Sequence, residues 1–187
     1  MRKFKNLVLA VAATLAFATS LAVTSPVTAN AQGLDRQQIM SKVRKELVRL
    51  PYYGVFDNLA YQVDGGTVTL YGQVVRPSTR EDAERRVAKI EGVERVVNQI
   101  EVLPLSSFDN SIRVRTLRTL ARAGSLYRYF MGANPSVHIV VNRGHLSLEG
   151  VVANEGDRRL AYITARGIPG VFSVTNNLRT DREARAY

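Results

Sequence analysis

The chain has 187 residues, a formal net charge of +10 and no cysteine. The lack of cysteine excludes a disulfide-stabilised scaffold and a lipoprotein with an acylated N-terminal cysteine. Without its N-terminal segment, the chain is long enough for one ordinary domain or two very small ones, which packing alone must stabilise.

The N-terminal residues 1–31 have the pattern of a secretory signal peptide. Basic residues at positions 2, 3 and 5 precede an apolar run at about residues 7–18, and small residues follow as far as Ala31. Thr14, Thr19 and Ser20 make the apolar run shorter than the roughly 20 residues of a membrane-spanning helix, which disfavours an uncleaved anchor. We therefore expect cleavage after Ala31 and a periplasmic protein that is not a lipoprotein.

The chain after residue 31 carries its positive charge unevenly. Residues 32–104 contain 11 basic and 10 acidic residues, whereas residues 105–187 contain 12 basic and 6 acidic residues. Every basic residue of the second half is arginine, whose planar guanidinium group pairs well with phosphate. An exported protein does not ordinarily meet nucleic acid, so we expect anionic phospholipid headgroups or other envelope polyanions as partners.

Two stretches of the chain repeat one pattern. A shift of 78 positions aligns residues 64–102 with residues 142–180 without a gap, which indicates an internal duplication. Asn98 and its counterpart Asn176 alternate in register with the apolar residues of the same strand, so we expect their side chains to point inward. There they should bind backbone groups, not a ligand. The residues interpreted as structural are Gly66, Gly72, Gly92 and Asn98 in the first copy, and Gly144, Gly150, Gly170 and Asn176 in the second.

In each copy, two segments of alternating apolar and polar residues predict a β-hairpin. In the first copy, a turn at Gly65–Gly66 places Val63 opposite Val68, so that the apolar side chains share one face. In the second copy the turn at residues 143–144 requires a positive φ at Arg143, and a bulged turn is an alternative. The apolar face there comprises Val137, Ile139, Val141, Leu146 and Leu148.

A helix is expected on either side of each hairpin. The first helices begin at Asp35 and Asp109, and the second begin at Ser78, which has capping-box spacing to Glu81, and at Asn154. The residues predicted to face the core are Ile39, Val43 and Leu47, then Val114, Leu117 and Ala121, in the first helices, and Ala83, Val87 and Ile90, then Ala161, Ala165 and Ile168, in the second.

These elements predict an α+β fold of two tandem αββαβ units. The third strand, at residues 93–102 and 171–179, returns after a helix, so it should join the hairpin by a right-handed crossover. Each unit is then a three-stranded mixed sheet with two helices on one face. The other face of the sheet is polar, and it is either exposed to water or turned toward the other unit. We place the domains at residues 32–104 and 105–180, followed by a charged C-terminal tail at residues 181–187 that we expect to be frayed.

This pattern resembles the BON domain, a module of periplasmic osmotic-shock proteins of the OsmY-like family and of related envelope lipoproteins. The segments that carry the resemblance are "VDGGTVTLYGQV", "IEGVERVVNQI", "VNRGHLSLEGVV" and "IPGVFSVTNNL". The resemblance covers nearly all of the chain after residue 31, in tandem. It implies attachment to phospholipid membranes, a role in envelope integrity and, for some members, a periplasmic chaperone role.

The first helix of the second unit and the loop after it form the candidate lipid-binding region. Arginines on one side of this helix can pair with lipid phosphates while aromatic rings enter the headgroup layer. The alternative is that the arginines form an ordinary solvated face and the aromatic residues pack into the core. The candidate residues are Arg115, Arg118, Arg122, Tyr127, Arg128, Tyr129, Phe130 and Met131.

The corresponding loop of the first unit contains Tyr52, Tyr53 and Phe56 with little charge. This composition favours packing or an inter-domain contact over a lipid site.

We expect no catalytic site, no cofactor and no metal site. The sequence contains no thiol, Gly-rich phosphate loop, metal-ligand spacing or nucleophile elbow. His138 and His145 share the outer sheet face in the expected register, but no carboxylate or third histidine is placed to complete a site, so we expect both at the surface.

Three binding functions therefore remain open. The favoured function is peripheral association with an anionic phospholipid membrane in support of envelope integrity or stress tolerance. The alternative is a periplasmic chaperone or osmotic-stress protein that binds unfolded polypeptide, and the third is a structural partner of envelope protein assemblies.

Overall fold

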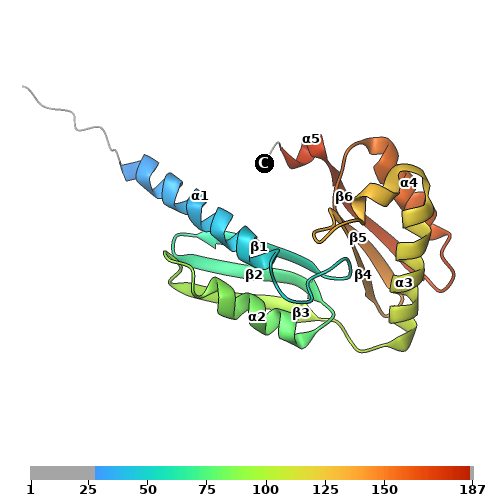
Figure 1. Cartoon of the computed structure of the whole chain (residues 1–187), viewed down its shortest axis with the longest axis horizontal. Coiled ribbons are helices and arrows are strands. Elements are labelled where there is room, and N and C mark those ends of the chain that lie inside the picture. The colour runs from blue at the N-terminus through green and yellow to red at the C-terminus, as the bar shows by residue number, and fades with distance from the viewer. Residues whose placement is uncertain (1–27, 186–187) are drawn as a thin grey trace, which may run out of the picture.

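The computed structural model describes residues 28–185, which form two three-stranded sheets with their own helices (Figure 1). The predicted α+β fold of two αββαβ units is confirmed. The elements are α1 (Thr28–Leu47), β1 (Asn58–Asp64), β2 (Thr67–Val74), α2 (Pro77–Val87), β3 (Arg95–Val102), α3 (Ser107–Arg122), the 3-10 helix η1 (Gly124–Tyr129), β4 (Val137–Asn142), β5 (His145–Val152), α4 (Glu155–Arg166), β6 (Ser173–Thr180) and α5 (Asp181–Ala184).

The predicted signal peptide falls on residues 1–31, of which residues 1–27 lie outside the described residues. Within residues 28–185, none of the helices is both long enough and apolar enough to cross a membrane.

The strand register follows the predicted hairpins. β1 pairs antiparallel with β2, with Val63 opposite Val68, and β4 pairs antiparallel with β5, with Val141 opposite Leu146. β3 and β6 join in parallel to β2 and β5, which are therefore the central strands. The turn at residues 143–144 is regular rather than bulged, because Arg143 and Gly144 take φ values of 52° and 80°, both positive as in a type I′ turn.

Each unit has a separate core between its sheet and its helices. In the first unit, Val43 of α1, Leu70 of β2 and Val87 of α2 are fully buried. In the second unit, Leu148 of β5 and Ala165 of α4 are fully buried at the equivalent positions. The inward faces predicted for both hairpins and for α1, α2 and α4 are confirmed.

The face of α3 that packs on the sheet differs from the predicted one. Ile112, Thr116 and Leu120 are fully buried, whereas Leu117 and Ala121 are only partly buried at the border of the core. The prediction was wrong because Thr116 and its neighbour Arg113, which is also buried, place polar residues on the core face and hide its apolar period.

The helix starts follow the predicted caps only in part. Asn154 caps α4 as predicted, and its side chain accepts a hydrogen bond from the Asp157 amide. The capping box predicted at Ser78 is absent, because α2 begins one residue earlier at Pro77 and its N-cap, Arg76, makes no side-chain cap. α3 is capped by Ser106, which leaves the Asp109 side chain for another role.

The C-terminal tail is more ordered than expected, since residues 181–184 form α5 instead of a frayed end. The Thr180 side chain accepts a hydrogen bond from the Glu183 amide, and the Glu183 carboxylate accepts one from the Thr180 amide, which completes a capping box. Glu183 also lies 3.3 Å from an Arg158 guanidinium nitrogen, and this pair ties α5 to α4.

The loop between α1 and β1 joins the two domains. The Ile139 amide on β4 donates to the Val55 carbonyl at 2.7 Å, and Val55 and Phe56 pack against the second core. The inter-domain contact expected for this loop is therefore observed. β4 faces the first domain, while α3 lies on the far side of the second domain (Figure 1).

Candidate functional site

The predicted arginine face lies on the exposed side of α3. Arg115, Arg118 and Arg122 are all exposed, opposite the buried residues that pack on the sheet. One Arg115 guanidinium nitrogen donates to the Pro169 carbonyl in the loop between α4 and β6. Arg118 and Arg122 take part in none of the ion pairs found within residues 28–185. Two guanidinium groups one turn apart are therefore free to meet an anion from solvent.

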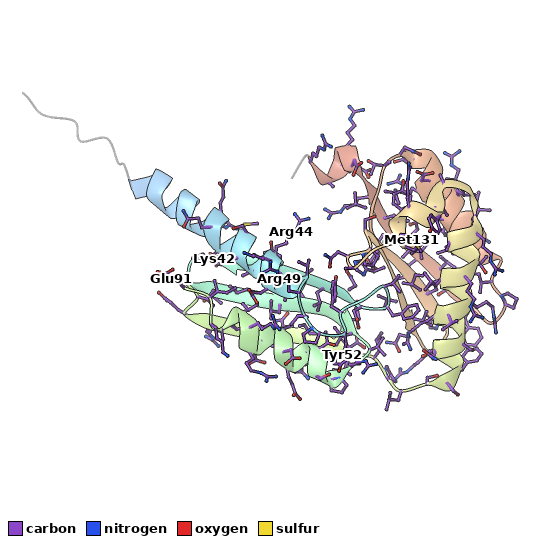
Figure 2. The ribbon with its side chains drawn as sticks, viewed as in Figure 1. Lys42, Arg44, Arg49, Tyr52, Glu91 and Met131 are labelled. Atoms are coloured by element: carbon purple, nitrogen blue, oxygen red, sulfur yellow. The ribbon has the colours of Figure 1, made fainter. Side chains whose placement is uncertain are left out.

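The loop after α3 only partly keeps the predicted exposure. Tyr127 and Met131 are 56% and 47% exposed, and Met131 is labelled in Figure 2. Tyr129 and Phe130 are instead buried in the second core together with Leu126. The first part of this loop forms the 3-10 helix η1, which turns these two rings inward, so the core-packing alternative holds for them.

Arg128 is exposed but already engaged with other side chains. Its guanidinium group donates to the Asp157 carboxylate and to the Tyr129 hydroxyl, and Asp157 also accepts from Ser125. The hydrogen bond from Ser125, then those from Tyr129 and Arg128, hold the pKa of Asp157 below its usual range. Arg128 therefore serves as a link between η1 and the start of α4.

The two histidines lie in different environments. His145 is exposed, as predicted, and its Nδ1 lies 2.7 Å from the Ser173 hydroxyl. His138 is buried, contrary to the prediction, because the first domain covers the outer face of β4. Its Nδ1 lies 3.2 Å from the Gly54 carbonyl, and its ring centroid lies 5.5 Å from that of Tyr53. Within the described part of the chain, no group of three or more potential metal ligands is present.

The matched glycines allow close approach of neighbouring backbone. Gly72 and Gly150 have φ values of 115° and 117°. A Cβ on Gly72 would lie about 2 Å from the Asn58 carbonyl oxygen, and a Cβ on Gly150 would lie about 2 Å from the Ser136 carbonyl oxygen. Gly92 and Gly170 each have a φ of 89° in the turn before the third strand. A residue with a Cβ does not fit at Gly72 or Gly150, which agrees with the structural role predicted for these two glycines.

The matched asparagines connect the third strand to the second helix of each domain. The Asn98 amide nitrogen donates to the Arg80 carbonyl, and the Asn176 amide nitrogen donates to the Arg158 carbonyl, both at 3.2 Å. Each side-chain oxygen accepts from the amide two residues ahead. Both residues bind backbone groups, as predicted.

Two buried charged residues of α3 were missed by the sequence analysis. The Asp109 carboxylate accepts from the Arg143 and Gly144 amides at 2.9 and 2.8 Å, which holds the hairpin turn in its positive-φ conformation. Arg113 donates to the Val141 carbonyl from inside the domain, and burial lowers its pKa. Nothing local in the sequence marks these roles, because both partners lie about 30 residues away.

The family comparison decides what kind of chain this is. The family model of the BON domain matches twice, at residues 35–104 and 109–182, and each match contains one sheet with its helices. The chain belongs to the BON domain family. The BON domain is a non-catalytic binding module, and BON domains as a class are associated with phospholipid membranes and the bacterial envelope.

Other comparisons add little to the BON assignment. No curated protein matches the chain in sequence. Two solved structures of CdsD, a structural protein of the type III secretion system of Chlamydia trachomatis, are similar at 11% identity and a TM-score of 0.28. The matches cover 80% and 75% of this chain and 96% of each CdsD chain. A TM-score this low carries no argument about function.

The two BON domains differ in the charge that they present. The first helix of the first domain also carries exposed cations, Arg44 and Lys45 among them, so the difference does not lie in this helix alone. It lies in the balance of charge, because residues 32–104 contain 11 basic and 10 acidic residues whereas residues 105–187 contain 12 and 6. The second BON domain is therefore the better candidate for an anionic surface.

Proposed function

We propose that this BON-domain protein is exported by a cleaved signal peptide, resides in the periplasm and binds anionic phospholipid through the second domain. The observation that carries the proposal is the pair Arg118 and Arg122, which are exposed on α3 and unengaged by ion pairs within residues 28–185. The position of α3 away from the first domain leaves this face accessible to a planar surface (Figure 1).

The proposed contact surface consists of Arg115, Arg118 and Arg122, with Tyr127 and Met131 at the end of the loop that follows. Arg128 is not counted as a direct lipid contact, because its guanidinium group donates to Asp157 and Tyr129. Through these hydrogen bonds it links η1 to α4 beside the proposed surface. Each arginine near an anionic membrane contributes on the order of 1 kcal/mol, so the expected binding is reversible and sensitive to salt. Such binding supports envelope integrity or stress tolerance without permanent anchoring.

Co-sedimentation with vesicles tests this function. We expect the chain from residue 32 onward to bind vesicles containing phosphatidylglycerol, to bind phosphatidylcholine vesicles poorly, and to dissociate in high salt. Arg118→Glu with Arg122→Glu should weaken binding by at least about tenfold, because attraction becomes repulsion at both positions.

The matched control is Arg95→Glu with Arg179→Glu, which makes the same charge change at exposed residues of β3 and β6. This control should lose much less binding than the α3 variant. Equal losses for the two double variants, or binding that persists in high salt, would rule out the α3 surface.

A second candidate function, a periplasmic chaperone or osmotic-stress protein, is favoured by a different observation. Phe172 and Phe108 are 70% and 47% exposed at one end of the second domain, where they offer apolar surface to an unfolded polypeptide. This function predicts that the chain suppresses aggregation of a client protein in the absence of vesicles.

A further inference from the structure

In each BON domain, two equivalent glycines lie at the end of the domain that carries the hairpin turn. The site formed by these two glycines is called the seat. In the second domain these are Gly144 and Gly170, and aromatic rings cover both. A Cβ on Gly144 would lie 2.7 Å from the Phe172 ring, and a Cβ on Gly170 would lie 3.6 Å from the Phe108 ring. The centroids of the two rings lie 6.0 Å apart. The second domain thus fills its own seat with a pair of aromatic side chains.

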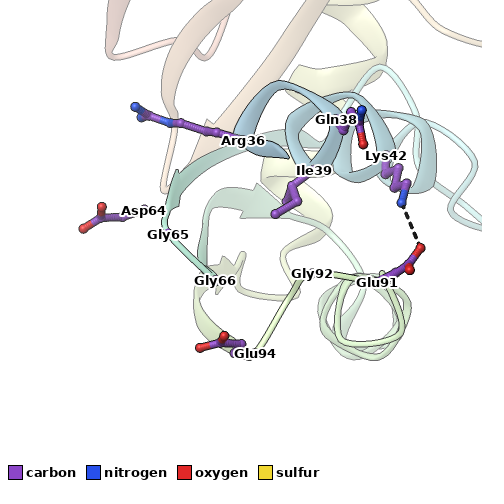
Figure 3. A pocket seen from close by; sticks show the side chains of 10 residues that line it. All are labelled: Arg36, Gln38, Ile39, Lys42, Asp64, Gly65, Gly66, Glu91, Gly92 and Glu94. Atoms are coloured by element: carbon purple, nitrogen blue, oxygen red, sulfur yellow. Dashed lines mark hydrogen bonds and ion pairs between the residues drawn. The ribbon is translucent and has the colours of Figure 1, made fainter. Parts of the chain in front are cut away.

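The equivalent glycines of the first domain have no aromatic ring over them among the described side chains. Glu94 occupies the position of Phe172, 78 residues earlier, and its side chain would lie 2.7 Å from a Cβ on Gly66, while Ile39 would lie 3.1 Å from a Cβ on Gly92. An open groove of about 810 Å³ lies beside these side chains (Figure 3). The Ile39 side chain points into this groove from α1 and provides an apolar floor.

The rim of the groove is mainly acidic. Asp64, Glu91 and Glu94 line it together with two cations, Arg36 and Lys42. Lys42 lies 3.4 Å from Glu91, so these two charges compensate each other and leave Asp64 and Glu94 against Arg36. The groove therefore combines an apolar floor with carboxylates at its edge, a combination that suits an aromatic side chain flanked by cations.

The aromatic end of the second domain has this complementary character. Phe172 is 70% exposed and Phe108 is 47% exposed, so the rings that fill the seat also face solvent. Exposed cations flank them: Arg143 lies in the adjacent hairpin turn, and Arg115 binds the Pro169 carbonyl beside Gly170. This aromatic end is Phe108 and Phe172 with Arg115 and Arg143.

We propose that the aromatic end of one molecule docks into the groove of the first domain of a second copy, head to tail. Phe172 would lie in the groove against Ile39, and the flanking arginines would face Asp64 and Glu94. The groove lies at the end of the first domain that is remote from the second domain, where Glu91 and Lys42 are labelled in Figure 2. A contact between two different surfaces can repeat, so it builds chains or closed rings rather than a single two-fold dimer.

Two complementary substitutions test this contact, with vesicles absent. Glu94→Phe introduces into the first domain the residue that covers the glycine seat in the second domain, and so blocks the groove. Phe172→Glu makes the reverse exchange and removes the ring from the aromatic end. Both exchanges copy a residue that the other BON domain already accommodates at that position, and circular dichroism melting checks that each variant is folded.

Sedimentation velocity of the chain from residue 32 onward provides the readout. The weight-average sedimentation coefficient of the unsubstituted chain should rise with concentration, and each variant alone should stay monomeric. A mixture of the two variants should form a one-to-one heterodimer and stop there, because only one groove and one aromatic end remain functional.

An unsubstituted chain that stays monomeric at every concentration would overturn the proposal, as would a mixture of folded variants that forms no heterodimer. If Phe172→Glu reduces vesicle binding or client protection while the unsubstituted chain remains monomeric, the aromatic end serves a membrane or an unfolded polypeptide, and self-association is wrong. Vesicle binding that fails while self-association is observed would instead reject only the proposed lipid function.

Discussion

Tyr129 joins three parts of the second domain through a single hydroxyl group. The hydroxyl donates to the Asp157 carboxylate at the start of α4, and it accepts from the Ala153 amide at 3.0 Å and from Arg128 at 2.7 Å. The ring itself is buried in the core. The residue therefore contributes both apolar burial and a polar connection between η1, the end of β5 and α4.

Removal of this hydroxyl should destabilise the second domain without a change in its packing. Tyr129→Phe keeps the ring but leaves the Ala153 amide and one oxygen of Asp157 without this partner. We expect the free energy of unfolding to fall by about 1–3 kcal/mol, as for other buried polar groups that lose a hydrogen bond. Urea unfolding monitored by circular dichroism measures this change.

The control is Tyr127→Phe, which removes the same atom from an exposed side chain two residues away. We expect this variant to lie within about 0.5 kcal/mol of the unsubstituted chain. If the two variants are equally stable, the Tyr129 hydroxyl makes no net contribution and the network only orients Arg128.

Each hairpin contains a glycine at which any Cβ would overlap the backbone of the neighbouring segment. Gly150 on β5 has a φ of 117°, and a Cβ there would lie 2.1 Å from the Ser136 carbonyl oxygen. Gly72 occupies the same position on β2, with a Cβ distance of 2.0 Å to the Asn58 carbonyl oxygen. Because the overlapping atom in each case is a backbone carbonyl oxygen, a Cβ could be accommodated only if the strand shifted.

We therefore expect Gly150→Ala to destabilise the protein by at least about 3 kcal/mol, because backbone strain and steric overlap act together. Gly132→Ala is a matched control, since Gly132 also has a positive φ of 89° but has no atom within 4 Å of the Cβ position. This control should cost only about 1–2 kcal/mol. Thermal melts of both variants separate the two effects, and similar losses would mean that the overlap is relieved by a small movement.

Local sequence patterns were sufficient for the strands, but not for every helix face. The alternation around Val63 and Val141 is a property of neighbouring residues, so it predicts both hairpins and their register. The core face of α3 contains Arg113 and Thr116, whose partners or packing come from distant elements. A periodicity argument cannot detect a polar residue that is buried by a long-range contact.

The candidate site shows the same division. The exposed arginines of α3 follow from helical spacing, which the structure keeps. The burial of Tyr129 and Phe130 does not follow from spacing, because the loop after α3 forms η1 and places both rings in the core of the second domain. The open groove of the first domain was also missed, since it depends on which side chain covers Gly66 in three dimensions.

The contact between the two BON domains is built around one buried histidine. His138 lies between Tyr53 and the Gly54 carbonyl of the first domain. A carbonyl oxygen only accepts hydrogen bonds, so Nδ1 carries a proton and the neutral ring leaves Nε2 free to accept from the Tyr53 hydroxyl. Burial raises the pKa of Tyr53 to about 12, so that this partner stays uncharged. The inter-domain contact is thus built for neutral His138.

Acidification should weaken this contact. Burial lowers the pKa of His138 below 6.5, and the charges of Asp57 and Glu149 only partly oppose this shift. Below about pH 6.5 the unfolded chain binds a proton at His138 more readily than the folded chain does, so stability is highest above this pH and falls as the pH decreases.

We expect the free energy of unfolding, measured in urea, to decrease between about pH 7.5 and about pH 5.5, and to decrease less steeply in His138→Gln. Asp157 and Glu183 are present in both proteins, so the difference in slope reports His138 together with Asp57, whose pKa depends on the charge of the histidine. Identical slopes would show that His138 is protonated as easily in the folded chain as in the unfolded chain, and that the domain contact does not respond to pH.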